Sequence, residues 1–119
     1  MSTEKVAKRL VELCHKGEFE TAQKELFADD AISIEPYATP EFDKETKGLK
    51  AIIEKGHKFN SMVEKVHHVE ISEPLVTGNV IAFALSMDMQ MKGHERSKMG
   101  ELCVYHVKDG KITSEQFFM

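Results

Sequence analysis

The chain ends in GELCVYHVKDGKITSEQFFM (residues 100–119), and this stretch predicts the fold more strongly than any other part of the sequence. It predicts two β-strands joined by a tight turn at residues 108–111. The Asp109-Gly110 pair of the turn is flanked by alternating apolar residues, a strong hairpin signal because Gly tolerates positive φ and Asp tolerates the left-handed region. Several polar residues stand where half-buried side chains are expected: Glu101, Tyr105, His106, Glu115 and Gln116. These residues are either satisfied inside the core or they line a pocket.

Helices are predicted in the first half of the chain. Apolar residues follow helical spacing over residues 6–14, with Ser2 or Thr3 as the N-cap and Gly17 as the stop signal. A second, shorter helix is expected over residues 19–27, closed by an Asp-Asp pair. A third helix is expected over residues 49–63.

Strands are predicted in the second half, after one short strand at residues 31–35. A polar loop at residues 37–47 is long for a compact domain, which makes it a candidate lid. The other predicted strands cover residues 66–72, 75–91 with a break at 77–79, 98–107 and 112–118. Helices followed by an antiparallel meander indicate a single α+β domain over residues 1–119, with the helices on one face of a curved sheet.

Composition excludes several classes of function. The net charge of −4 comes without a basic stripe, which argues against nucleic acid as a partner. No apolar run approaches the roughly 20 residues of a membrane span, and no apolar signal core follows Met1, so we expect a cytoplasmic protein. Cys14 and Cys103 lie inside apparent regular elements, where buried free thiols are expected rather than a disulfide.

The longest predicted strand carries a row of methionines. Alternation places Ile81, Phe83, Leu85, Met87, Met89 and Met91 on one face. Such a row suits plain core packing, and it also suits a pliable apolar ligand cavity. Asp88 falls on the opposite face, where it either enters a pocket and binds a ligand or is solvated.

Three segments carry a resemblance to a known family. The segments LFADDAISIEP (residues 26–36), Gly48 before the third helix and VKDGKI (residues 107–112) resemble the nuclear-transport-factor-2-like superfamily. Within it, residues 67–76 and 101–118 resemble small bacterial SnoaL-like proteins, which are relatives of polyketide cyclases and ketosteroid isomerases. The resemblance implies a cone-shaped, strongly bent antiparallel or mixed sheet that, with about three N-terminal helices, encloses a pocket. It also implies a homodimer formed through the sheet, and it leaves the chemistry open because this fold hosts many functions.

Glu35 is the sharpest candidate for catalysis. It precedes Pro36, where the ketosteroid isomerase pattern has its general-base carboxylate. An apolar environment can raise the pKa of such a carboxyl toward the working pH. The alternative is a solvated acid at the end of a strand. The resemblance also shows departures: Leu10 stands near the place of the oxyanion-hole tyrosine, and Cys103 stands at or next to the second donor. A steroid isomerase is therefore not expected.

Other residues could supply the missing donors. If Cys103 faces the cavity, alternation places Glu101 and Tyr105 beside it, and the resemblance favours Glu115 and Phe117 as cavity-facing. We assign Glu101 and Tyr105 to catalysis with Glu35. The ligand-binding candidates are Asp88, Cys103, Glu115, Phe117 and Phe59. A polar pair that merely supports the sheet remains the alternative for the Glu and Tyr residues.

His67 and His68 are adjacent on a strand, so they point to opposite faces and cannot bind one metal there. One of them could face the pocket as an acid–base partner of Glu35, and we assign this role to His68. No metal-binding, phosphate-loop or nucleophile-elbow spacing occurs, so no metal or cofactor is expected.

The sequence leaves two functions open. One is a cofactor-independent isomerase, cyclase or dehydratase that acts on a small apolar carbonyl compound. The other is a non-catalytic ligand-binding or dimerisation module with the same fold.

Overall fold

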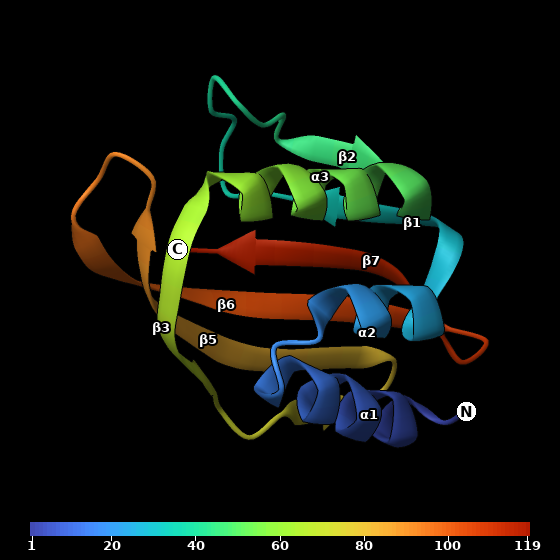
Figure 1. The fold of residues 1–119 in the computed structure, drawn as a ribbon. Helices are drawn as coiled ribbons and strands as arrows, with labels where there is room; N and C mark the ends of the chain where they lie inside the picture. Colours follow the sequence, from blue (N-terminus) through green and yellow to red (C-terminus); the bar gives the residue numbers. More distant parts are fainter.

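Three helices lie against one face of a strongly bent sheet in the computed structural model, which describes all of residues 1–119 (Figure 1). The helices are α1 (Thr3–His15), α2 (Phe19–Leu26) and α3 (Leu49–Met62). The strands are β1 (Phe27–Ile34), β2 (Glu45–Lys47), β3 (Val63–Ile71), β4 (Leu75–Thr77), β5 (Val80–Met91), β6 (Arg96–Lys108) and β7 (Lys111–Phe118). The predicted α+β class is confirmed.

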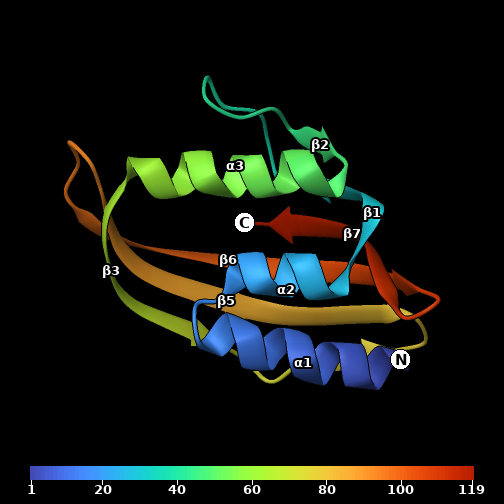
Figure 2. The same cartoon turned by 45° about the vertical axis from the view of Figure 1, so that its right-hand side comes forward.

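The sheet is mixed and does not close. Its strand order is β2-β1-β7-β6-β5-β3, and β4 pairs with β5 beside this path. β1 and β7 run parallel, whereas the other neighbours run antiparallel. At one end of the molecule β3 turns away from the other strands and connects to α3, so the sheet curls around the helices (Figures 1 and 2).

The first helix follows its sequence signals. Ser2 is the N-cap and its side chain accepts a hydrogen bond from the Lys5 backbone N–H over 3.2 Å. Gly17 has φ 73° just after the helix, a conformation that favours glycine. The buried residues of α1 are Val6, Ala7, Leu10, Leu13 and Cys14, and they form one stripe toward the sheet.

The boundary between α2 and β1 differs from the prediction. The helix ends at Leu26, and β1 begins directly at Phe27 instead of residue 31. Phe27 pairs with Ile112 of β7, a partner 85 positions later in the chain that no local pattern reveals. The pairing shifts between Phe27 and Ile32, and this irregularity leaves the Asp-Asp pair exposed within the strand rather than at a helix end.

The predicted lid loop is shorter than expected because β2 occupies its last residues. The remaining loop is attached to α3 through one side chain. Lys58 Nζ donates a hydrogen bond to the Glu41 carbonyl and lies 5.0 Å from the centre of the Phe42 ring. This loop rises above α3 in Figure 1.

α3 is fixed to β1 at its start. Gly48 has φ 94° and its backbone N–H donates to the Ala31 carbonyl over 2.8 Å. Ile52 on the next turn is fully buried. Lys55 lies three residues later, so it shares the inward face of the helix.

Alternation along β6 matches the sequence analysis. Cys103 and Tyr105 are buried, whereas Leu102 and His106 on either side of this pair are exposed. On β5, Ile81 and Phe83 are buried in the main core, and Met87 packs against it. The two cysteines are buried and free, as predicted.

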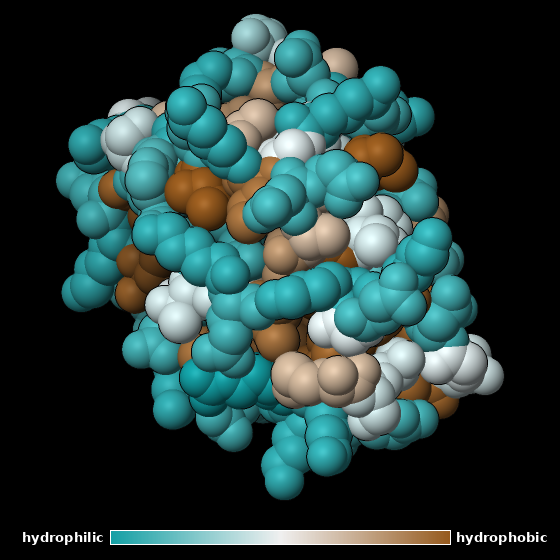
Figure 3. Space-filling model, turned by 90° about the vertical axis from the view of Figure 1, so that its right-hand side faces the viewer, coloured by the Kyte–Doolittle hydropathy of each residue, from teal (hydrophilic) through white to brown (hydrophobic).

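The surface is mainly hydrophilic on the end that carries the β6–β7 turn. Apolar areas there are small and interrupted by polar side chains (Figure 3). No helix of the chain is both long and apolar enough to cross a bilayer.

Candidate ligand-binding site

A chain of hydrogen bonds crosses the interior from α3 to β7. Lys55 Nζ donates to Ser33 Oγ on β1 over 2.6 Å, and Ser33 Oγ donates to Glu115 Oε2 on β7 over 2.7 Å. Ser33 and Glu115 stand opposite each other in the parallel pair of β1 and β7. They are the only polar or charged residues of the chain that are buried. The bonds therefore join three elements around a polar centre in an apolar interior.

Glu35 lies beside this chain at the end of β1. It follows Ser33 by two positions, and its Oε1 lies 3.4 Å from Lys55 Nζ. The side chains of Lys55 and Glu35 are 16% and 27% exposed. Glu35 is therefore the member of the cluster that solvent and a ligand reach most easily, and it is neither fully solvated nor buried.

Glu101 adds a third carboxyl to the same interior. Burial is the main cause that raises the pKa of Glu101 to about 7, and the charges of Glu35 and Glu115 act in the same direction. Lys55 opposes this change. The direct partner of the carboxyl is weak, because Cys103 Sγ donates to Glu101 Oε1 over 3.8 Å.

Burial also raises the pKa of Glu115 to about 7, although the Ser33 hydrogen bond and the Lys55 charge both lower it. Desolvation, together with the negative charge of Glu35, is thus stronger than the two stabilising partners. Two neighbouring carboxyls that titrate near neutral pH are a feature of acid–base sites.

Tyr105 and the thiols form the uncharged wall of the site. Tyr105 stacks on Phe83 with 5.5 Å between ring centres and meets Phe27 edge to face. Burial holds the pKa of Tyr105 well above 10, so its hydroxyl keeps its proton at neutral pH. Burial likewise raises the pKa of the Cys14 thiol to about 12 and that of Cys103 further. These thiols are neutral and poor nucleophiles.

The predicted apolar ligand residues lie on the same faces as the charged ones. Phe59 is one turn after Lys55 on α3 and is partly buried. Phe117 follows Glu115 by two positions on β7 and packs against the core. The ligand-binding role of both residues stays a prediction.

Asp88 and His68 do not join the cluster. Asp88 makes two hydrogen bonds of 2.9 and 2.8 Å with Arg96. It lies on the outer face of β5 because Met87 and Met89 on either side face inward. His68 is 65% exposed and contacts Glu70. His67, its neighbour, is the inward histidine, as Val69 and Ile71 of the same strand face are partly or fully buried.

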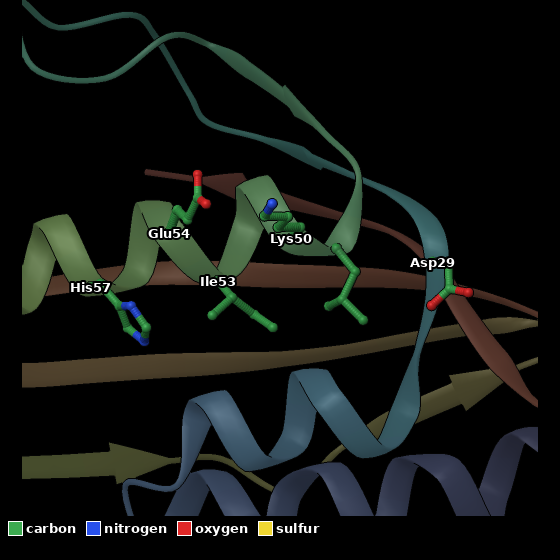
Figure 4. A pocket seen from close by; sticks show the side chains of 6 residues that line it. Asp29, Lys50, Ile53, Glu54 and His57 are labelled. Carbon is green, nitrogen blue, oxygen red and sulfur yellow. The ribbon is translucent and has the colours of Figure 1, made fainter.

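An open hollow of about 590 Å³ lies elsewhere, along α3 and beside Asp29 of β1. Ile53 and His57 point from α3 toward α2 in Figure 4, and His57 pairs with Glu20 of α2. A second hollow of about 260 Å³ includes His68 and Asp88. Neither is lined by Glu35, Lys55 or Glu115, so the enclosed pocket around these residues stays a prediction.

Sequence reasoning missed Lys55 and Ser33. Ser33 could have been found, because it alternates with Glu35 on the predicted strand. Lys55 carried a weaker signal: it falls between Ile52 and Phe59 at helical spacing, but a lysine there is normally taken to extend into solvent. No group of three or more His, Cys, Asp or Glu side chains is arranged to hold a metal ion.

A helix-covered, curled sheet with an interior carboxyl cluster defines a class of small-molecule-binding folds. The chain belongs to the SnoaL-like domain family, whose model matches residues 1–119. A protein from Mesorhizobium loti, provisionally named a SnoaL-like polyketide cyclase [carbohydrate phosphatase], is similar over 100% of both chains, with 31% identity and a TM-score of 0.93.

More distant structures share the fold alone. A Xanthomonas campestris protein of unknown function with a cystatin-like fold has 18% identity and a TM-score of 0.83, covering 99% of this chain and 90% of its own. IdmH from Streptomyces antibioticus, provisionally named a polyketide cyclase, has 17% identity and a TM-score of 0.73, covering 99% and 91%. No curated protein matches the sequence.

Glu115→Gln tests the buried carboxyl. The native protein holds a proton that the unfolded chain releases between pH 4.5 and about 7. This group therefore lowers the free energy of unfolding as the pH rises through that window. Glutamine keeps the shape of the neutral acid, so the variant should gain up to about 3 kcal/mol over the wild type between about pH 5 and pH 8. Denaturant unfolding at several pH values measures this gain.

The matched control is Glu73→Gln in an exposed position, which should show no such trend. A stability difference between Glu115→Gln and wild type that stays constant with pH would contradict the raised pKa.

Proposed function

We propose that this protein is a cofactor-independent enzyme that moves a proton within a small apolar carbonyl compound, in a reaction of the isomerase, cyclase or dehydratase type. One observation carries the proposal: Lys55 and Glu35 are paired at the accessible edge of an otherwise apolar interior that holds two carboxyls with a pKa of about 7. The provisional cyclase name of the Mesorhizobium loti relative supports the same class of chemistry.

Glu35 is the proposed general base. A carboxylate that removes a proton from the carbon next to a carbonyl must reach the substrate and be protected from bulk water. Glu35 meets both conditions, since it is partly exposed and lies beside the buried Ser33. Its distance of 3.4 Å from Lys55 Nζ places base and cation on the same part of a substrate.

Lys55 is the proposed stabiliser of the enolate that proton removal creates. An ammonium group has three N–H donors. One donates to Ser33 Oγ over 2.6 Å, a second is directed toward Glu35 Oε1, and the third is left for a substrate oxygen. A positioned cation in a low-dielectric site stabilises developing negative charge strongly. Lys55 could thus supply what Leu10 and Cys103 cannot.

Glu101 is the proposed acid that delivers a proton to a second carbon. With a pKa of about 7, about half of this carboxyl is protonated at neutral pH. Tyr105 lies two positions after Cys103 on the same face and can donate a hydrogen bond to a carbonyl. In this scheme Glu35 takes the proton from the carbon next to the carbonyl, Lys55 holds the enolate oxygen, and protonated Glu101 gives its own proton to a second carbon of the substrate. The cycle closes when the partly exposed Glu35 releases its proton to solvent and Glu101 takes up another.

Glu35→Gln should abolish the reaction. With a β,γ-unsaturated ketone such as 3-cyclohexenone in D₂O, NMR follows deuterium exchange and conversion to the conjugated enone. Loss of the base should reduce the rate roughly a hundredfold or more, and Lys55→Met should reduce it by a similar factor. The exposed variant Glu73→Gln should react like the wild type. Unchanged exchange in Glu35→Gln would rule out Glu35 as the base.

A second candidate function is a non-catalytic binding or dimerisation module, and the outer face of the sheet favours it. Ala84, Leu102 and Phe118 are neighbours in register across β5, β6 and β7. Leu102 and Phe118 are 45% and 47% exposed, although both are large and apolar. We propose that this face, which we call the outer apolar face, pairs with the same face of a second copy to form a homodimer.

Leu102→Glu tests the dimer. A charge in the middle of the outer apolar face should prevent association, because it would be buried without a partner. Analytical ultracentrifugation should give twice the 13.5 kDa mass for the wild type and the single mass for the variant. The matched variant Lys92→Glu, in the turn before β6, should remain dimeric. A wild type that sediments as a monomer would contradict the proposal.

A further inference from the structure

His67 has the one buried side-chain nitrogen or oxygen of the chain without a hydrogen-bond partner. The atom is Nε2, which is shielded from solvent. Leaving such an atom unpaired destabilises the folded protein, so an unpaired buried atom in a native structure requires a physical reason.

The strand geometry directs His67 inward. Val66 pairs with Met89 and His68 pairs with Asp88, so His67 is the extra residue of a register shift between them. The regular pairing that follows puts Val69 opposite Met87 on the inner face, and His67 shares this face. Bulges of this kind redirect a side chain and occur often beside functional sites.

The inner face of β5 beside His67 is apolar and adaptable. Met89, next to the bulge, is buried, and Met87 packs against the core. A charged group close to His67 is Asp88 on the other face of β5, whose pKa is lowered mainly by its hydrogen bonds with Arg96 and also by the nearby His67. Methionine side chains are flexible and polarisable, so they can repack around a small molecule. An imidazole with no partner among such side chains provides a single polar contact in an apolar surround, the usual composition of a small-molecule site.

We infer that His67 Nε2 forms a hydrogen bond with the hydroxyl group of a small, mainly apolar ligand that lies against the inner face of the paired strands β3 and β5, beside Met87 and Met89. A hydroxyl satisfies either tautomer of the ring, because it both donates and accepts a hydrogen bond. A hydrocarbon of the same size satisfies neither. This inference rests on the proposed function in one respect, since both require a ligand in the interior. It assigns the ligand contact to His67 instead of His68.

Phenol and toluene are matched probes for this contact, since they differ mainly in a hydroxyl and a methyl group. In ¹⁵N NMR of the wild type, phenol should shift the His67 Nε2 resonance, while toluene should leave it unchanged. Phenol should also bind at least tenfold more tightly than toluene. His67→Phe should remove this preference, and His68→Phe should retain it. Equal binding of both probes, a phenol complex without a His67 shift, or no binding of phenol would each overturn the inference.

A second measurement does not need a ligand. His67→Phe removes the unpaired nitrogen, so the melting temperature of the ligand-free protein should rise by about 3–6 °C, whereas His68→Phe should change it little. A lower melting temperature for His67→Phe would show that Nε2 has a partner in the free protein.

If the enone reaction proceeds but phenol does not shift the His67 Nε2 resonance, only the inference about His67 fails. If phenol binds at His67 but Glu35→Gln has no effect, only the catalytic assignment fails.

Discussion

The charge of Lys55 is the constraint on which the interior of this protein depends. Its ammonium contacts Ser33 and Glu35 directly and reaches Glu115 through the Ser33 hydroxyl. Without it, carboxyls on β1, β6 and β7 would share an apolar interior with no cation in contact, and desolvation and mutual repulsion would favour their neutral forms. The hydrogen bond from Lys55 to Ser33 also joins α3 to the sheet.

The same arrangement explains how the fold can support chemistry although two expected donors are missing. Leu10 is buried in the core and has no polar group, and Cys103 has a thiol that burial keeps neutral. In the proposed function, Lys55 and Glu101 take over the role of these donors with different chemistry, a cation and a carboxyl with a pKa of about 7. We therefore expect a reaction through an enolate, in which charge is stabilised by a cation rather than by neutral hydroxyl groups.

Much of the fold could be predicted because its signals are local. The turn at Asp109-Gly110 forms as predicted. The alternation along β6 places Cys103 and Tyr105 together on the buried face. The predictions from sequence were wrong where a contact between residues far apart in the chain determines the local structure. Phe27 joins a strand because it pairs with Ile112, and the choice between His67 and His68 depends on a bulge that only the β3–β5 register reveals. Lys55 was missed because no sequence pattern distinguishes a lysine that extends into solvent from one that is paired inside.

The measurement that tests this account most directly is a ¹³C NMR titration of the glutamate side-chain carboxyls in the wild type and in Lys55→Met. Glu101 and Glu115 should titrate near pH 7 in the wild type. Both should titrate at higher pH in Lys55→Met, because the charge of Lys55 lowers the pKa of each carboxyl. Titration of both carboxyls in the range of ordinary solvated glutamates, with no change in Lys55→Met, would contradict the account.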